Sequence, residues 1–305
     1  MSRIREALKK AAEERSAQRD SNPTEDLIEV LNVAPLEPGA EVVTQPALPG
    51  RYATDKLDES TRSYKALIAK CRRMTWNVKA RYSVFTPEMD RFSGAERFRT
   101  LRSRLYQISA VQPLKRVLLT SSIPEEGKTF VVTNLAQSMV RQADRRVLMI
   151  DADLRASRLH LTLGAENEPG LSDYLSGDKE LTQIIQLGEA DNFCFIPGGR
   201  YVENPSELLH SDKMRALMDR MGQLFDWVLL DSPPAIAVHD ASILADMCDG
   251  VLFVVRAGAT DFEVAQKAAS EFENKNLLGV VLNRVDKSEA YGDYYYGYEN
   301  PRESE

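Results

Sequence analysis

Short apolar runs recur along the last two thirds of the chain and predict buried strands. They are RVLLTS (116–121), RVLMI (146–150), FCFI (193–196), DWVLL (226–230), GVLFVV (250–255) and LLGVVL (277–282). Stretches with helical character lie between most of them. Apolar strands that alternate with helices are typical of a mostly parallel sheet covered on both faces. The pattern therefore predicts an α/β fold with helices on both faces of the sheet.

Two helix starts carry capping signals. Ser93 and Glu96 form an S-x-x-E capping box ahead of residues 98–108, where apolar residues recur at helical spacing. Residues 204–207 (NPSE) combine a capping asparagine, a proline at the first helical position and an acid in the first turn. We expect helices to begin at these two places.

The N-terminal part has a different composition. Residues 1–20 predict a short amphipathic helix, which is either a solvated, frayed helix or a docking helix for a partner. Residues 21–60 contain five prolines and many acids, which is typical of a linker. Residues 61–85 are mixed and basic and receive no role. We therefore expect 1–85 to be a helix with a largely flexible linker, 86–290 to be the α/β domain and 291–305 to be a separate tail.

Composition narrows the class of protein. The net charge of −7 over 305 residues argues against a general nucleic-acid binder. The three cysteines are odd in number and form no CxxC, so we expect neither a disulfide framework nor a zinc site. The expected compartment is therefore the reducing cytoplasm. No apolar run approaches the roughly 18–20 residues that span a bilayer. We expect a cytoplasmic chain that only a partner could bring to a membrane.

Chemistry gathers where the predicted strands end, which is where parallel sheets bind ligands. Gly127, Lys128 and Thr129 stand between a strand and a helix and form the functional half of a P-loop. Main-chain N–H groups there can hold phosphate oxygens, Lys128 can reach the β- and γ-phosphates, and the Thr129 hydroxyl can bind Mg²⁺. Ser122 occupies the position of the first glycine in the standard motif.

Three aspartates follow two other predicted strands. Asp151 and Asp153 come after the second apolar run, and Asp231 follows the run at 226–230. Carboxylates at the ends of buried strands are costly unless they meet a cation, and Mg²⁺ prefers such hard oxygen ligands. Each aspartate alone could instead cap a turn, but the three together beside a P-loop indicate a magnesium site.

These motifs resemble those of the bacterial tyrosine kinases. SSIPEEGKT (121–129) resembles their variant Walker A, LMIDADLR (148–155) their Walker A′ and VLLDSPP (228–234) their Walker B. Glu96, Arg99 and Arg102 match their E-x₂-R-x₂-R oligomerisation motif. The resemblance covers about residues 90–300 and extends to a tyrosine-rich tail, whose tyrosines are Tyr291, Tyr294, Tyr295, Tyr296 and Tyr298.

The resemblance implies a P-loop NTPase fold and transfer of phosphate from Mg-ATP to the tail tyrosines. It implies catalytic roles for Lys128, Asp151 and Asp153, with Asp151 accepting or orienting the tyrosine proton. Magnesium would be held directly by Thr129 and Asp153, and directly or through water by Asp231. Asp151 and Asp153 could also both touch the metal. Arg155 has either a role in the motif or a structural salt bridge. The implied nucleotide-binding residues are Ser122, Glu126, Gly127, Lys128, Thr129 and Phe130.

The C-terminal tail has the composition typical of a segment whose tyrosines are exposed as substrates. It holds five of the eleven tyrosines in its last fifteen residues, and residues 286–305 contain six acids against two basic residues. Each phosphate adds a charge of roughly −1.5 to −2. An unmodified tail would dock at the site and a modified one would leave it. The alternative is an aromatic-rich tail that merely adheres to a partner.

The resemblance also implies partners. It implies a homo-oligomeric ring in which each tail enters a neighbour's active site, and a membrane polysaccharide copolymerase that recruits and activates the kinase at the inner face of the membrane. The implied role is regulation of exopolysaccharide or capsule biosynthesis and export. Without the resemblance, Glu96, Arg99 and Arg102 would be a capping acid and two surface arginines.

Two other functions remain open. A MinD/ParA-like positioning ATPase would carry a signature lysine five residues before Lys128, where this chain has Ile123, and it would lack a tyrosine tail. A scaffold could also bind nucleotide without transferring phosphate. Asn283, at the end of the last predicted strand, is a candidate for contact with adenine. The three histidines, His160, His210 and His239, have no metal-ligand spacing and are expected to be structural.

Overall fold

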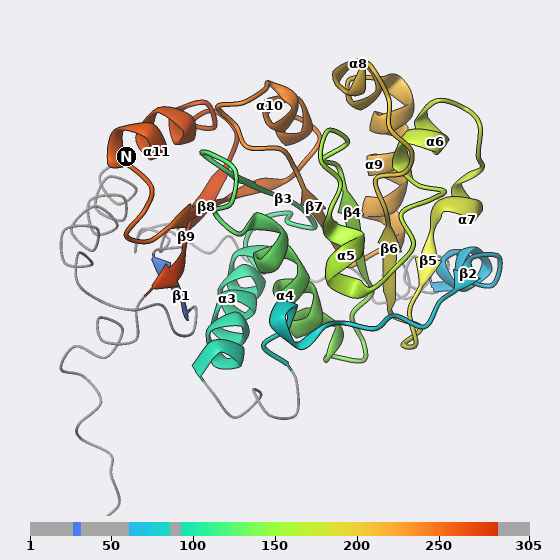
Figure 1. Cartoon of the computed structure of the whole chain (residues 1–305). Helices are drawn as coiled ribbons and strands as arrows, with labels where there is room; N and C mark the ends of the chain where they lie inside the picture. Colours follow the sequence, from blue (N-terminus) through green and yellow to red (C-terminus); the bar gives the residue numbers. More distant parts are fainter. Residues whose placement is uncertain (1–26, 32–60, 86–92, 286–305) are drawn as a thin grey trace, which may run out of the picture.

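The computed structural model describes residues 27–31, 61–85 and 93–285. In this part of the chain nine strands form one sheet in the order β1-β9-β8-β3-β7-β4-β6-β5-β2 (Figure 1). The six from β9 to β6 are parallel, β1 is antiparallel to β9, and β5 is antiparallel to β6. The strands are β1 (Leu27–Leu31), β2 (Arg72–Arg73), β3 (Arg116–Ser121), β4 (Val147–Asp151), β5 (Gln186–Leu187), β6 (Phe193–Ile196), β7 (Trp227–Asp231), β8 (Gly250–Arg256) and β9 (Leu277–Val285).

Helices cover both faces of the sheet. In Figure 1, α3 and α4 lie below the sheet, and α10 and α11 lie above it. The hydrophobic residues of α3, α4 and α5 pack in one core cluster, and those of the other helices pack in a second. The helices within residues 93–285 are α3 (Ser93–Ser109), α4 (Lys128–Val140), α5 (Leu159–Leu163), α6 (Leu171–Leu175), α7 (Leu181–Ile184), α8 (Pro205–Leu209), α9 (Asp212–Leu224), α10 (Asp240–Ala245) and α11 (Phe262–Ser270).

The alternation of side chains along each strand explains why the apolar runs are uninterrupted. In β3, Val117 and Leu119 join the cluster under α3 and α4, whereas Leu118 joins the cluster on the opposite face. In β7, Leu229 and Leu230 divide between the two faces in the same way. Successive strand residues point to opposite faces, so a sheet covered on both sides needs apolar residues at every position. The predicted fold class is confirmed.

The two predicted helix starts are found. Helix α3 begins at Ser93, and Phe98, Leu101 and Leu105 are completely buried on its inner face. Helix α8 has Pro205 at its first position. The side chain of Asn204, however, makes no capping hydrogen bond, so the proline and the acid in the first turn mark this start more reliably than the asparagine does.

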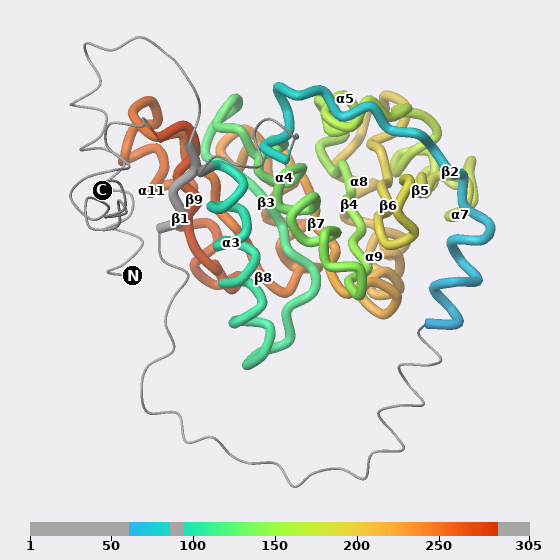
Figure 2. The backbone as a smooth tube through the Cα atoms, turned by 90° about the horizontal axis from the view of Figure 1, so that it is seen from below, coloured from blue at the N-terminus to red at the C-terminus, as the bar shows by residue number. Residues whose placement is uncertain are grey.

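The core begins earlier than the predicted boundary near Thr86. Residues 61–68 are helical, and Tyr64 packs edge-on against Phe225 with ring centroids 5.3 Å apart. Further along, Trp76 packs against Phe193 at 5.1 Å. Figure 2 shows this segment running from the β2 edge towards α4. Residues 61–85 are thus part of the folded domain.

Some predictions fall outside the described residues. The amphipathic helix predicted for residues 1–20 and the tail at 291–305 are among them. Strand β1 lies in the stretch that composition assigned to a linker, and it pairs through Leu31 with Val280 of β9. Within the described residues, no helix has the length and apolar character needed to cross a membrane.

Candidate active site

The phosphate loop lies at the carboxyl edge of the sheet, between β3 and α4. Gly127 precedes α4 with a left-handed φ of 93°. A Cβ on this residue would lie 1.9 Å from Nδ2 of Asn283, so the position admits only glycine. The N–H groups of Lys128, Thr129 and Phe130 follow in the first turn of α4, where they have no partner within the helix and suit an anion.

The side chains of Glu126 and Phe130, two of the predicted nucleotide-binding residues, contact other parts of the protein. Glu126 is 1% exposed, and its carboxylate accepts hydrogen bonds from the Ile123 N–H and the Thr260 hydroxyl. The ring of Phe130 packs near that of Phe98, with centroids 6.1 Å apart. The side chain of Glu126 therefore shapes the loop from inside, and Phe130 can offer a phosphate its main-chain N–H.

Two aspartates are brought side by side. Asp151 ends β4, Asp231 ends β7, and the two are register partners on neighbouring parallel strands. Both are buried, at 0% and 3% exposure. The Asp151 carboxylate accepts bonds from the Ser157 hydroxyl at 2.8 Å and the Leu159 N–H at 3.0 Å. The topology thus joins the predicted Walker A′ and Walker B acids in one site.

The electrostatics of this pair favour protonation. Burial raises the pKa of Asp151 above the ordinary aspartate range, and the neighbouring Asp231 raises it further. Burial also raises the pKa of Asp231, against the opposing effects of Lys128 and of the hydrogen bond from Thr129. Like charges that are buried together disfavour the ionised forms. A cation at this position would relieve both effects.

The donor set fits a magnesium ion. The Thr129 hydroxyl donates to Oδ2 of Asp231 at 2.6 Å, and Oδ1 of Asp231 is buried with no hydrogen-bond partner among the described residues. Asp153 is partly exposed beside them. No three His, Cys, Asp or Glu side chains cluster as a complete metal site in the described part of the chain. At a phosphate site Mg²⁺ takes only one or two protein carboxylates and completes its shell with phosphate oxygens and water.

Arg155 forms the salt bridge that was one of its two predicted roles. Its Nε donates to Asp240 Oδ2 at 2.8 Å, and its Nη2 donates to the Ser206 hydroxyl at 2.8 Å. Asp240 is 1% exposed. Because Ser206 lies on α8 and Asp240 on α10, Arg155 ties the turn after Asp151 to two helices and fixes its position.

The three residues of the predicted oligomerisation motif separate into two kinds. Glu96 and Arg99 form an exposed ion pair of 3.0 Å on α3. Arg102 is half-buried and donates to the Ser138 carbonyl of α4 at 2.5 Å. Arg102 therefore joins two helices of the same chain, whereas Glu96 and Arg99 are accessible to a second chain.

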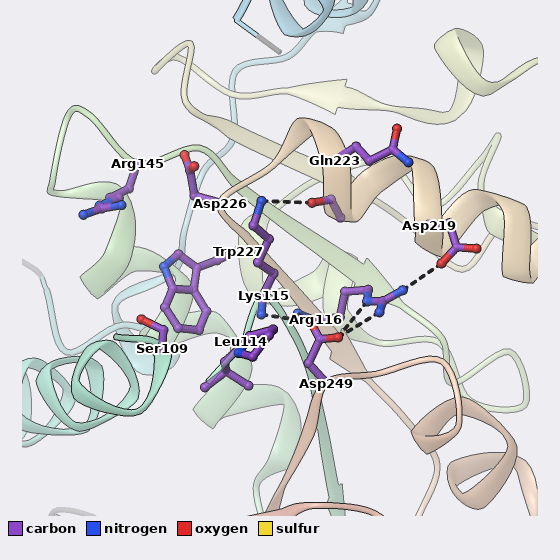
Figure 3. A pocket seen from close by; sticks show the side chains of 12 residues that line it. Ser109, Leu114, Lys115, Arg116, Arg145, Asp219, Gln223, Asp226, Trp227 and Asp249 are labelled. Atoms are coloured by element: carbon purple, nitrogen blue, oxygen red, sulfur yellow. Dashed lines mark hydrogen bonds and ion pairs between the residues drawn. The ribbon is translucent and has the colours of Figure 1, made fainter. Parts of the chain in front are cut away.

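A cleft of about 560 Å³ lies at the opposite edge of the sheet (Figure 3). Its lining includes Lys115, Trp227 and Arg116, and Arg116 is held between Asp219 and Asp249. Arg116, Trp227 and Asp249 stand at the amino ends of β3, β7 and β8, and Asp219 lies in α9. The cleft is thus separate from the phosphate loop.

The buried pair predicts a dependence of stability on pH. Because the pKa of each aspartate is raised in the folded state, each one stabilises the fold fully below about pH 4, the ordinary pKa of aspartate. This stabilisation is lost as the pH rises through the raised pKa. Asp231→Asn removes one charge and keeps an oxygen for Thr129. Without nucleotide and in EDTA, this variant should unfold at a higher temperature than the wild type at about pH 8, by a margin that shrinks towards pH 4. Asp144→Asn, at an exposed aspartate, should show no such trend, and a margin independent of pH would contradict the account.

Comparison with known proteins agrees with this geometry. Residues 118–301 match the family model of the CobQ/CobB/MinD/ParA nucleotide binding domain. The tyrosine-protein kinase YwqD of Bacillus subtilis (strain 168) is 35% identical over 207 residues, which are 67% of this chain and 86% of that protein.

Two solved structures extend the comparison. The kinase domain of the Escherichia coli tyrosine kinase Etk matches with a TM-score of 0.61 at 36% identity, over 68% of this chain and 81% of that one. The chimerical protein CapA2B2 matches with a TM-score of 0.64 at 26% identity, over 74% of this chain and 100% of that one. The chain spans only 27% of full-length Etk from strain K12. With its P-loop, its paired aspartates and these relatives, the chain belongs to the bacterial tyrosine-protein kinases, within the CobQ/CobB/MinD/ParA nucleotide-binding family.

Proposed function

We propose that the chain transfers phosphate from Mg-ATP to the tyrosine hydroxyls of its own C-terminal tail. The observation that carries this proposal is the meeting of a P-loop lysine, Lys128, with the buried carboxylates Asp151 and Asp231 at one edge of the sheet. Phosphoryl transfer is mainly a matter of positioning and of charge stabilisation, and this edge offers both.

Nucleotide and metal would be held by the first turn of α4 and by the strand ends. Lys128 is the cation for the β- and γ-phosphates. Thr129, Asp153 and Asp231 are the oxygen ligands for Mg²⁺, Asp231 either directly or through water. When bound, the ion neutralises negative charge on the transferring phosphate. Asn283, whose Nδ2 donates to the Glu126 carbonyl at 2.8 Å, keeps its place as the candidate for contact with adenine.

Asp151 is assigned to the tyrosine proton. A proton acceptor works best when its pKa lies near the working pH, and burial raises the pKa of Asp151 in that direction. The bonds from Ser157 and Leu159 fix its Oδ2, so the carboxylate is held in one orientation. Its role is to accept or orient the phenol proton during transfer.

The tail is long enough to reach these carboxylates. Strand β9 ends at Val285, at the same edge as the P-loop, and four strand spacings of the sheet separate it from β4, about 19 Å. Tyr291 lies six residues beyond Val285, which extend to about 20 Å, and Tyr298 reaches further. This reach also permits transfer within one chain. We assign the tail to a neighbouring copy's site in a homo-oligomeric ring on the ground of the family resemblance alone.

The wider role follows from the family resemblance. A membrane polysaccharide copolymerase would recruit the chain to the inner face of the membrane, with residues 1–20 as the contact, and the kinase would regulate exopolysaccharide or capsule biosynthesis and export. Adding membranes that contain the copolymerase should then raise tail phosphorylation. Ile123, at the position of the MinD/ParA signature lysine, and the named relatives both favour the kinase over a positioning ATPase.

Lys128→Met should abolish tail phosphorylation without unfolding the protein, because it removes the phosphate-binding cation and keeps an apolar stem of similar length. Mass spectrometry after incubation with Mg-ATP should find phosphate on tyrosines between Tyr291 and Tyr298 in the wild type only. Lys115→Met, in the remote cleft, is the matched control and should remain active. A Lys128→Met chain that labels its own tail would refute the assignment.

The same variant tests transfer between copies. Lys128→Met chains are mixed with active chains whose five tail tyrosines are replaced by phenylalanine. Phosphate on the Lys128→Met tail establishes transfer between chains. Hydrolysis of ATP with no tyrosine labelled, also in the presence of the copolymerase, would favour the positioning ATPase.

Arg99→Glu should reduce the chain to monomers. The change reverses the charge of a side chain that is 35% exposed and whose ion-pair partner Glu96 is 69% exposed. Arg102 is kept, because its bond to Ser138 holds α3 to α4 and its loss would confuse folding with assembly. The mass is measured by light scattering, with Arg97→Glu, about 200° around the same helix, as the control. An oligomer of unchanged mass would contradict the assignment of this surface.

A further inference from the structure

Glu126 is a buried carboxylate beneath the phosphate loop. Its Oε2 accepts the Ile123 N–H at 2.8 Å, and its Oε1 accepts the Thr260 hydroxyl at 2.6 Å. The Ser122 hydroxyl and the Arg256 N–H lie further away, each at 3.4 Å from Oε1. Every group facing the side chain can donate, so the site suits a carboxylate better than an amide.

The main chain of Glu126 is held as well. Its carbonyl accepts the Asn283 Nδ2–H at 2.8 Å from the end of β9. Thr260 lies between β8 and α11, is 2% exposed, and donates its own N–H to the Arg256 carbonyl at 3.2 Å. The loop is thus fastened through one residue to two neighbouring strand ends, by a side chain on one side and a carbonyl on the other.

The residues on either side of Glu126 have an unusual backbone. Glu125 has φ 67° and Gly127 has φ 93°. Residues other than glycine rarely occupy the left-handed region, and they persist there only where surrounding bonds over-determine the conformation. The bonds to Glu126 are in place to do this. They thereby fix the directions of the N–H groups that precede and begin α4.

We propose that Glu126 and Thr260 are positioning residues that hold the P-loop in its phosphate-binding shape without touching the nucleotide. A carboxylate close to phosphates would repel them, whereas one buried behind the loop acts through the N–H groups that it orients. The inference rests on the nucleotide site described under the proposed function. It gives a role to Thr260, which lies outside every recognised motif.

The test removes one hydroxyl. Thr260→Val keeps the branched shape and leaves the buried Glu126 oxygen without its shortest donor, whereas Thr260→Ser keeps the hydroxyl. Ser172→Ala is the control, because Ser172 is also fully buried and donates one bond, to the Arg200 carbonyl at 2.8 Å, away from the loop. For each variant we would measure the Kd for Mg-ADP by fluorescence, and kcat and KM for ATP by phosphorylation of the tail. The temperature of thermal unfolding would be measured without nucleotide.

Thr260→Val should weaken Mg-ADP binding by about tenfold, the size expected for one hydrogen bond to a charged group. KM for ATP should rise by a similar factor with kcat within about twofold, since phosphate binding is lost equally in the ground and transition states. Thr260→Ser should restore both values. Ser172→Ala should lower the unfolding temperature and leave the Kd unchanged.

Wild-type Mg-ADP affinity in a folded Thr260→Val variant would overturn the proposal. So would a loss of Mg-ADP affinity in Thr260→Ser and Ser172→Ala as large as the loss in Thr260→Val. If Thr260→Val does not fold, Glu126→Gln decides in its place, because the amide keeps the volume and turns one acceptor into a donor. A wild-type chain that binds Mg-ADP and labels no tyrosine, also in the presence of the copolymerase, would contradict the kinase proposal alone. A wild-type chain that binds no Mg-ADP would overturn both.

Discussion

Two carboxylates buried side by side, Asp151 and Asp231, are the constraint on which the rest of the site depends. They end neighbouring parallel strands in register, and their mutual repulsion and burial oppose ionisation. Hydrogen bonds from Thr129 and Ser157, with the nearby charge of Lys128, offset part of this cost. A divalent cation that binds together with the phosphates of a nucleotide would offset the rest of this cost.

The surrounding structure keeps this arrangement rigid. Arg155 joins the turn after Asp151 to α8 and α10 through a buried aspartate, Asp240. On the other side of the P-loop, Glu126 is fastened to the ends of β8 and β9. Such bonds cross between elements far apart in sequence, so the phosphate loop and the paired acids are fixed relative to each other. Transfer chemistry that relies on positioning needs this kind of frame.

Local signals predicted much of the fold. The uninterrupted apolar runs gave the strands of the parallel sheet, and Ser93 marked the start of α3. The part played by residues 61–85 could not be predicted in this way, because the rings that pack Tyr64 and Trp76 against the core belong to residues more than a hundred positions away. The same holds for the site: the motif included Glu126, whereas the positioning role that we propose for it depends on the bond from Thr260, which carries no sequence signal.

The most direct measurement of the central claim is single-turnover transfer of the γ-phosphate to the tail in the wild type and in Asp151→Asn. The amide keeps an oxygen for Ser157 and Leu159 and removes the charge. We predict that the transfer rate falls by about 10² to 10⁴, the usual contribution of a general base, with Mg-ADP affinity preserved. Transfer at the wild-type rate would contradict the claim that these buried carboxylates carry the chemistry.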